Sequence, residues 1–228
     1  MLLNGKKGLG TFTLIVHFLN YIFTKNEKNS YNLNEKIINT DSFFYNQLLN
    51  QTNQDVILIK AEENRNIKIE DIRNLKANIS NSSLSKNPRF IVIDEVEFIN
   101  DNSANALLKA LEEPNVNNFF ILINNQQANL IKTVSSRCLI NNIFLSSNKI
   151  EVATNYLLKK NNIEDLLGFR SNLTPGLFLY FNDIYLKLSI NHEDKILIKI
   201  NKLLNAYKKN KVKLLITLTL FLIDQYFL

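Results

Sequence analysis

The sequence contains very little cysteine and histidine. Cys138 is its one cysteine, and His17 and His192 are its two histidines. A single thiol forms no intramolecular disulfide, and these three side chains lack the number and spacing of a zinc site. The composition therefore excludes a disulfide scaffold and a cysteine-built zinc module, and it indicates a protein of the reducing cytoplasm.

Long uninterrupted hydrophobic runs are also lacking. The apolar segment at residues 9–23 follows two lysines, as in a signal peptide, but no small-residue cleavage site comes after it. The apolar C-terminal segment contains Lys213 and Asp224, and its uncharged run is shorter than the ~18 residues that a membrane-spanning helix needs. We interpret both segments as buried helices and expect no membrane partner.

Acidic residues are fewer than basic ones in this chain of 228 residues, which has a net charge of +6 and a pI of about 9.2. A mildly basic chain favours work near nucleic acid, but a biased composition rich in lysine, asparagine and isoleucine explains the charge equally well. Charge alone leaves both explanations open. The densest basic group lies near the C-terminus and comprises Lys202, Lys208, Lys209, Lys211 and Lys213.

Four short apolar runs have the composition of buried β-strands. They lie at Met1–Leu3, Val56–Ile59, Phe90–Ile93 and Phe119–Ile123. Helical patterns separate them, which predicts an α/β fold whose parallel sheet is flanked by helices. After about residue 145 only helical patterns follow. We expect an α/β domain over residues 1–145, a small helical lid domain over 146–183 and a helical C-terminal segment over 184–228.

The clearest helical pattern is "NSANALLKALEEP", residues 102–114. Its apolar residues recur at i, i+3, i+4 and i+7, which places them on one face of a helix. Asn102 or Ser103 is expected to cap the start of this helix. Pro114 is expected to end it, because proline disfavours helical geometry in the preceding residue and has no N–H to donate.

A glycine-rich stretch near the N-terminus, "GKKGLGTF", is similar to a phosphate-binding loop, which reads G-x-x-x-x-G-K-[ST]. Gly5 and Gly10 stand at the required spacing, with Gly8 between them, but Thr11 replaces the lysine and Phe12 replaces the hydroxyl residue. In a working loop the lysine contacts the β- and γ-phosphates, and the hydroxyl binds Mg²⁺. Thr11 and Phe12 can do neither.

Two further motifs carry polar side chains. The apolar run at Phe90–Ile93 ends in Asp94 and Glu95, at the sheet edge where open α/β folds bind ligands. In a nucleotide hydrolase such an aspartate positions Mg²⁺, and the glutamate orients the attacking water. Farther along, Arg137 follows Ser136 in the stretch "SSRC". Alone, neither motif is distinguished from a solvated strand end or a surface arginine.

The order of these motifs resembles the AAA+ clamp-loader subunits of bacterial DNA polymerase III, over residues 1–180. In that family a helix reading A-N-A-L-L-K-x-L-E-E-P follows the Asp-Glu strand, and "ANALLKALEEP" stands here at residues 104–114. The next strand ends in a polar pair and leads to a Ser-Arg-Cys motif, here Ser136 to Cys138. The segment "IKIEDIRNL", residues 67–75, is also similar to the family.

The resemblance implies a non-hydrolysing, delta-prime-type member, because three parts of the nucleotide pocket depart from the ATPase pattern. The glycine loop has lost its lysine and hydroxyl at Thr11 and Phe12. The second sensor, which carries an arginine in ATPase members, aligns with "LTPGL" and places Gly176 there. The strand-end pair is Asn124-Asn125, where threonines are usual.

The nucleotide-binding positions implied by the resemblance are then relics. Backbone groups of Gly5, Gly8, Gly10 and Thr11 form the degenerate loop, which keeps at most weak phosphate binding. Asp94 and Glu95 are the Walker B-like pair and have lost their metal-holding partner. We expect no metal and no cofactor bound by this chain.

In the family the arginine of the Ser-Arg-Cys motif acts in trans. It reaches the ATP site of the neighbouring subunit and offsets charge on the γ-phosphate, an effect worth about 10³–10⁵ in rate. The resemblance therefore gives Arg137 the role of an arginine finger, supported by Ser136. The implied partners are the ATP-binding gamma/tau subunits, the delta subunit and, through the complex, the sliding clamp and primed DNA, whose contacts would be to backbone phosphates.

Two alternatives remain within the family: an ATP-hydrolysing gamma/tau-type subunit with a divergent loop, or a degenerate AAA+ scaffold outside replication. An unrelated α/β domain would require the match at residues 104–114 to be chance.

The sequence also departs from the family pattern. Relatives have more chain before the glycine loop and many carry a four-cysteine zinc module, and Leu188–Leu228 is too short for their helical collar.

Overall fold

The computed structural model describes residues 1–61, 66–80, 87–114, 117–168 and 173–227. These residues form two compact units, and the short turn Lys7–Leu9 groups with the second unit although it is near the N-terminus. The first unit comprises Met1–Lys6 and Gly10–Phe144. The second unit comprises Lys7–Leu9 and Leu145–Leu228. The finer division into an α/β domain, a lid and a C-terminal segment stays a prediction.

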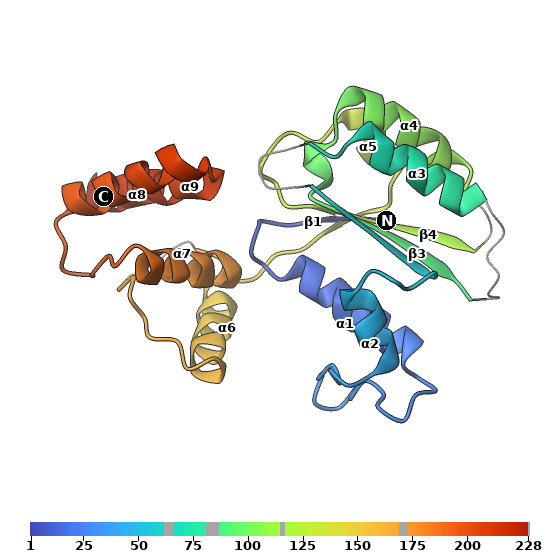
Figure 1. Ribbon diagram of the computed structural model, residues 1–228, viewed down its shortest axis with the longest axis horizontal. Coiled ribbons are helices and arrows are strands. Elements are labelled where there is room, and N and C mark those ends of the chain that lie inside the picture. The colour runs from blue at the N-terminus through green and yellow to red at the C-terminus, as the bar shows by residue number, and fades with distance from the viewer. Residues whose placement is uncertain (62–65, 81–86, 115–116, 169–172, 228) are drawn as a thin grey trace. The chain divides into compact units, whose positions relative to one another are not determined.

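The first unit is built on a parallel sheet of five strands in the order β2-β3-β4-β1-β5 (Figure 1). Branched and aromatic residues fill its central strands, and all six residues of β3 are buried, as expected for a sheet covered on both faces. This parallel sheet, with helices on its faces, confirms the α/β fold predicted from the sequence. The strands are β1 (Leu2–Asn4), β2 (Val56–Lys60), β3 (Arg89–Asp94), β4 (Asn118–Asn124) and β5 (Ile140–Asn142).

Helices cover both faces of this sheet (Figure 1). Successive side chains of a strand point to opposite faces, so β3 contributes to two hydrophobic clusters. Phe90 and Val92 pack in the cluster with α1 (Thr11–Phe23) and α2 (Phe43–Leu49). Ile91 and Ile93 pack in the other cluster, with α3 (Ile69–Ser80), α4 (Asp101–Glu112) and the short elements η1 (Val96–Phe98) and α5 (Lys132–Ser135).

The four strands predicted from apolar runs are confirmed, each extended by up to two polar residues. The fifth strand, β5, was not predicted. It consists of Ile140, Asn141 and Asn142, all exposed, and it has neither the length nor the alternation that identifies a strand in sequence. Its place at the edge comes from its pairing with β1, which depends on residues distant in the chain.

The predicted helix at "NSANALLKALEEP" is confirmed as α4, but its cap is not the one expected. The cap is Asn100, whose side-chain oxygen accepts a hydrogen bond from the Ser103 backbone N–H at 2.8 Å. Asn100 has the extended backbone that a capping residue requires, whereas residues 102 and 103 already lie within the helix. The helix ends at Glu112, before Pro114.

The second unit is helical throughout its described residues. Its helices are α6 (Ser147–Lys160), α7 (Pro175–Lys187), α8 (Ile196–Asn210) and α9 (Lys213–Phe227), and they share one hydrophobic cluster centred on Phe178, Phe181 and Tyr185. The segments interpreted as buried helices are the helices α1 and α9, but each keeps large exposed apolar residues, among them Leu14 and Leu220. None of the described helices has the length and apolarity to span a membrane.

Candidate functional site

The glycine-rich stretch forms a turn between β1 and α1. Gly5 follows β1 and donates its N–H to the Asn124 carbonyl at 3.0 Å. Gly10 precedes α1 with a φ of 87°, a left-handed conformation that glycine adopts without strain. Thr11 begins α1 and is buried, and its hydroxyl has no hydrogen-bond partner. At the position that the resemblance aligns with the phosphate-binding lysine, this chain therefore has a short, buried side chain whose hydroxyl makes no hydrogen bond.

The middle of this turn is packed tightly against the start of α7, within the second unit. The Thr174 hydroxyl donates to the Lys7 carbonyl at 2.6 Å, and the Gly176 N–H donates to the Gly8 carbonyl at 2.8 Å. A Cβ on Gly8 would lie 2.3 Å from the Thr174 Oγ1 and 2.6 Å from the Leu177 nitrogen, so only glycine fits there. An N–H group in the first turn of α7 is thus satisfied by the turn itself, whereas helix N-termini elsewhere bind phosphate.

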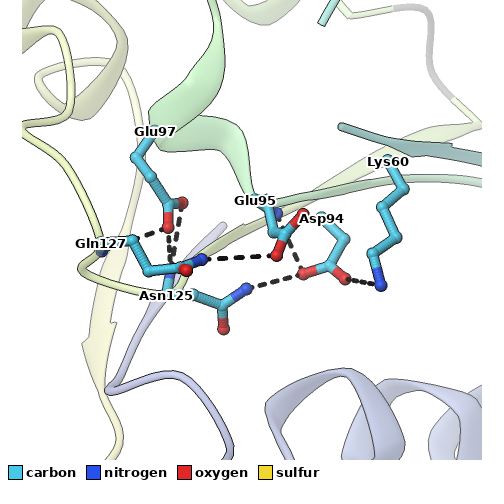
Figure 2. Close-up of polar contacts among 6 residues, drawn as sticks. All are labelled: Lys60, Asp94, Glu95, Glu97, Asn125 and Gln127. Atoms are coloured by element: carbon cyan, nitrogen blue, oxygen red, sulfur yellow. Dashed lines mark hydrogen bonds and ion pairs between the residues drawn. The ribbon is translucent and has the colours of Figure 1, made fainter. Parts of the chain in front are cut away.

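Asp94 lies at the carboxyl end of β3 and is buried in a polar cluster (Figure 2). Its Oδ1 accepts hydrogen bonds from the Glu95 N–H at 2.9 Å and from the Asn125 side-chain amide at 3.0 Å. Its Oδ2 lies 3.7 Å from the ammonium of Lys60. Both carboxylate oxygens of the Walker B-like aspartate therefore have partners supplied by the chain.

Lys60 was missed by the sequence analysis, although a signal existed. It is the last residue of β2, and β2 pairs with β3 so that Lys60 stands directly opposite Asp94. The Lys60 ammonium also lies 6.0 Å from the centre of the Phe12 ring. The resemblance aligns Phe12 with the Mg²⁺-binding hydroxyl of a phosphate-binding loop. The Lys60 ammonium therefore lies near Asp94 and Phe12, the two positions at which the resemblance implies metal ligands in an ATPase.

Glu97 is a second buried carboxylate in this cluster and was also missed (Figure 2). It accepts hydrogen bonds from the Asn125 N–H, at 3.1 Å and 3.2 Å, and from the Gln127 N–H at 3.4 Å. The Gln127 side-chain amide donates to Glu95 at 3.4 Å. These contacts hold the segment after β4 against the segment after β3, so Asn125 has a structural role here.

Burial raises the pKa of two carboxyls in this cluster, Asp94 and Glu97. It raises the pKa of Asp94 above its usual value, and the Lys60 ammonium opposes this only in part. Burial likewise raises the pKa of Glu97, against the hydrogen bonds from backbone N–H groups. Across the described ranges, no group of three or more histidine, cysteine or acidic side chains could hold a metal ion. The cluster is therefore suited to holding the sheet edge together.

Arg137 follows α5 and contacts none of the residues of this cluster in the hydrogen bonds and ion pair described for it. Its Nε forms an ion pair with Glu112, and its Nη1 donates to the Thr133 carbonyl at 3.0 Å. The side chain is 35% exposed. The Ser136 hydroxyl donates to the same Thr133 carbonyl at 3.1 Å, which closes the turn that presents the arginine. Glu112, at the end of the conspicuous helix α4, was not predicted to have this role.

Comparison with known proteins gives a consistent family. The family described as "DNA polymerase III, delta subunit" matches residues 1–145. A "DNA polymerase III subunit delta'" of Buchnera aphidicola subsp. Schizaphis graminum is 28% identical, over 98% of this chain and 69% of its own length. Its counterpart in Buchnera aphidicola subsp. Baizongia pistaciae is 25% identical, over 66% of this chain and 48% of its own length. This chain therefore spans between about half and two thirds of these relatives.

Gamma subunits match a shorter part of the chain. The "DNA polymerase III subunit gamma" of Buchnera aphidicola subsp. Schizaphis graminum is 37% identical over 101 residues, which cover 43% of this chain and 28% of its own. Among solved structures, a DNA polymerase III gamma subunit-related protein of Thermotoga maritima has a TM-score of 0.48 and 18% identity over 99% of this chain and 71% of its own. With residues 1–145 matched by the family profile, this chain belongs to the DNA polymerase III delta subunit family.

Proposed function

We propose that this chain is a delta-prime-type subunit of the bacterial clamp loader. It does not hydrolyse ATP itself, and it donates Arg137 to the ATP site of a neighbouring subunit while the sliding clamp is loaded on DNA. The family assignment supports the clamp-loader part of this proposal. The polar cluster and the Arg137 turn support the division of roles.

The observation that carries the proposal is the ion pair between Lys60 and Asp94. Asp94 is the residue that would position Mg²⁺ in a hydrolysing relative. Here the positive charge beside it is a lysine, fixed to the chain and opposite Asp94 in the sheet register. Together with Thr11 and Phe12, this leaves the nucleotide position without a phosphate-binding cation and without a hydroxyl ligand for a metal. Intrinsic hydrolysis needs both.

Arg137 is held in a way that suits a role in trans. Its ion pair with Glu112 is exposed on both sides, and exposed pairs contribute only about 0–1 kcal/mol. The arginine can therefore exchange Glu112 for the γ-phosphate of a bound nucleotide at little cost. Ser136 and the Thr133 carbonyl keep the turn in shape while this happens.

The partners in this proposal are the gamma/tau subunits, which bind the ATP, together with the delta subunit, the clamp and primed DNA. Relatives named gamma and tau match the same chain, in keeping with subunits of one assembly that share a fold. No cofactor of its own is needed for the proposed role. DNA would be contacted, if at all, through its phosphates.

The decisive experiment is reconstitution of the complex with Arg137→Ala. We expect the variant to assemble normally and to load clamps at least about 10²-fold more slowly, because an arginine finger contributes about 10³–10⁵ in rate. Arg73→Ala, which removes an exposed arginine on α3, is the matched control and leaves loading unchanged. Unchanged loading by the Arg137 variant in an assembled complex would show that the arginine finger lies elsewhere.

An ATP-hydrolysing gamma-type subunit is the second candidate, favoured by the higher identity to gamma relatives over the matched segment. Isothermal titration of the purified chain with ATP and Mg²⁺ separates the two. The delta-prime-type proposal predicts no measurable binding. Micromolar binding would support the gamma-type alternative, and failure to recover polymerase III subunits in a pull-down would favour a scaffold outside replication.

A further inference from the structure

A cavity of about 630 Å³ lies in the first unit, at the amino ends of β2 and β3. It is at the opposite end of β3 from Asp94, because Arg89 opens this strand and Asp94 closes it. Its walls come from the end of α2, the segment that leads into β2, the strand β2 itself, Asn78 of α3 and Arg89. Nothing in the proposed clamp-loader role uses this cavity.

Arg89 is the unusual member of this lining. Its residue is only 8% exposed, its Nη1 donates to the Asn78 carbonyl at 2.9 Å, and its buried Nε has no acceptor. Buried arginine side chains are almost always paired with a carboxylate. Asp55 lies beside Arg89 across the sheet, since its carbonyl accepts from the Phe90 N–H at 2.8 Å, and its carboxylate accepts a hydrogen bond from Asn87 at 3.1 Å. None of the described residues forms an ion pair with Arg89.

Apart from Arg89, the lining residues that the structure describes are uncharged. Four of its side chains other than Asn78 are carboxamides, which come from Gln47, Gln51, Asn53 and Gln54. Asn53 donates to Gln47 at 2.8 Å and accepts from the Asp55 N–H at 2.9 Å, so part of this wall is held in place. Leu48, Val56 and Leu58 supply an apolar surface beside the amides. The cavity thus combines a single positive charge, neutral hydrogen-bonding groups and hydrocarbon.

This combination fits a particular class of ligand. With Nη1 occupied by the Asn78 carbonyl, the Nε edge of the guanidinium remains without an acceptor, and a carboxylate pairs with two parallel N–H groups of such an edge. One fixed positive charge among neutral groups balances one negative charge, whereas a phosphate dianion would keep a charge in excess. Pockets of 300–1,000 Å³ are typical of small-molecule sites.

We propose that this cavity binds a small organic monocarboxylate, with the carboxylate on Arg89, neutral polar groups on the amides and a hydrocarbon part against Leu48, Val56 and Leu58. Binding would relieve the burial of an arginine that lacks a counter-ion. The site lies on the β2 edge of the sheet and does not depend on nucleotide, so it is independent of the proposed role in clamp loading.

Nuclear magnetic resonance of the ¹⁵N-labelled full chain tests the proposal, with N-acetyl-L-leucine as the probe. We expect saturable shifts of the Arg89 Nε–H and of the side-chain amides of Gln47, Gln51 and Asn53, with a dissociation constant of about 1 mM. The matched neutral probe, N-acetyl-L-leucinamide, and inorganic phosphate are expected to bind at least about tenfold more weakly. Equal binding of either probe would overturn the assignment of a monocarboxylate.

Arg89→Gln removes the charge and keeps a polar side chain, and it is expected to weaken binding at least about tenfold. Because this residue is buried, a second pair of variants uses the exposed Gln54. Gln54→Glu should weaken binding about threefold and Gln54→Lys should strengthen it by a similar factor. Gln126→Glu, the same change at the other end of the sheet, is the control. Shifts that are insensitive to both charges at position 54 would contradict the proposal.

Discussion

The polar cluster around Asp94 and the turn that carries Arg137 differ in how completely other residues of the chain pair with the charged side chain. Asp94 is buried, and each of its carboxylate oxygens has a partner from the chain. Arg137 is 35% exposed and rests on one exposed carboxylate. On the proposed function, Asp94 no longer takes part in a reaction and its charge is satisfied by the fold, whereas Arg137 acts on a neighbouring subunit and must be able to leave its partner.

The largest expected effect on stability tests how tightly the glycine turn is packed around Gly8. Gly8→Ala would place a methyl group 2.3 Å from the Thr174 hydroxyl on a backbone with φ of +84°, so we expect a loss of about 1–3 kcal/mol in the free energy of unfolding. Gly10→Ala is a matched control, since it has the same left-handed backbone but open space around its Cβ, and it should cost about 1 kcal/mol. Urea denaturation of both variants measures the difference, and equal losses would mean that the turn is not tightly packed.

Removing the internal cation should have a smaller effect. Lys60→Met leaves the buried Asp94 carboxylate without its positive neighbour, but the Lys60 side chain is 62% exposed, so solvent screens part of the interaction. We expect a loss of about 0.5–1 kcal/mol at pH 7, measured by urea denaturation. Lys25→Met, at an exposed lysine after α1, is the control. A stability equal to that of the parent would indicate that Asp94 does not need the charge.

The pH dependence of stability follows from the buried carboxyls. Because burial raises the folded-state pKa of Asp94 and Glu97, the folded state binds protons more readily than the unfolded chain. Their contribution is fully present below their ordinary values and is lost as the pH rises through the raised values. Denaturation between pH 4 and pH 7 should show a decline that is reduced in Asp94→Asn and unchanged in the exposed control Asp101→Asn. A profile that is the same in both variants would contradict the assignment.

The smallest expected effect concerns the exposed ion pair. Glu112→Gln removes the partner of Arg137, and we expect the free energy of unfolding to change by less than about 0.5 kcal/mol. In the reconstituted complex, clamp loading should not fall, because the arginine is released more easily. Glu113→Gln, at the adjacent residue, is the control. A marked loss of loading in Glu112→Gln would mean that Glu112 orients Arg137 for its action on the neighbouring subunit, and that it is more than a partner for the arginine in the isolated chain.

Local patterns were enough to predict the central strands, the helix α4 and the strand-turn-helix around Gly10. They were not enough for β5 or for the partners of Asp94. Lys60 reaches Asp94 only because two strands pair in parallel register, and Arg137 reaches Glu112 only because α5 packs near the end of α4. A single sequence indicates which residues are apolar and how they recur, but pairing between distant segments is decided by the whole fold.

The position of Lys60 has a consequence for redesign of the chain. On the proposed function, a nucleotide site would need changes at three positions: a lysine at Thr11, a hydroxyl at Phe12 and removal of the Lys60 ammonium from beside Asp94. A lysine placed at Thr11 alone would add a second cation near the Lys60 ammonium, and like charges repel each other. We therefore expect that no single substitution among the three creates an ATP-binding site.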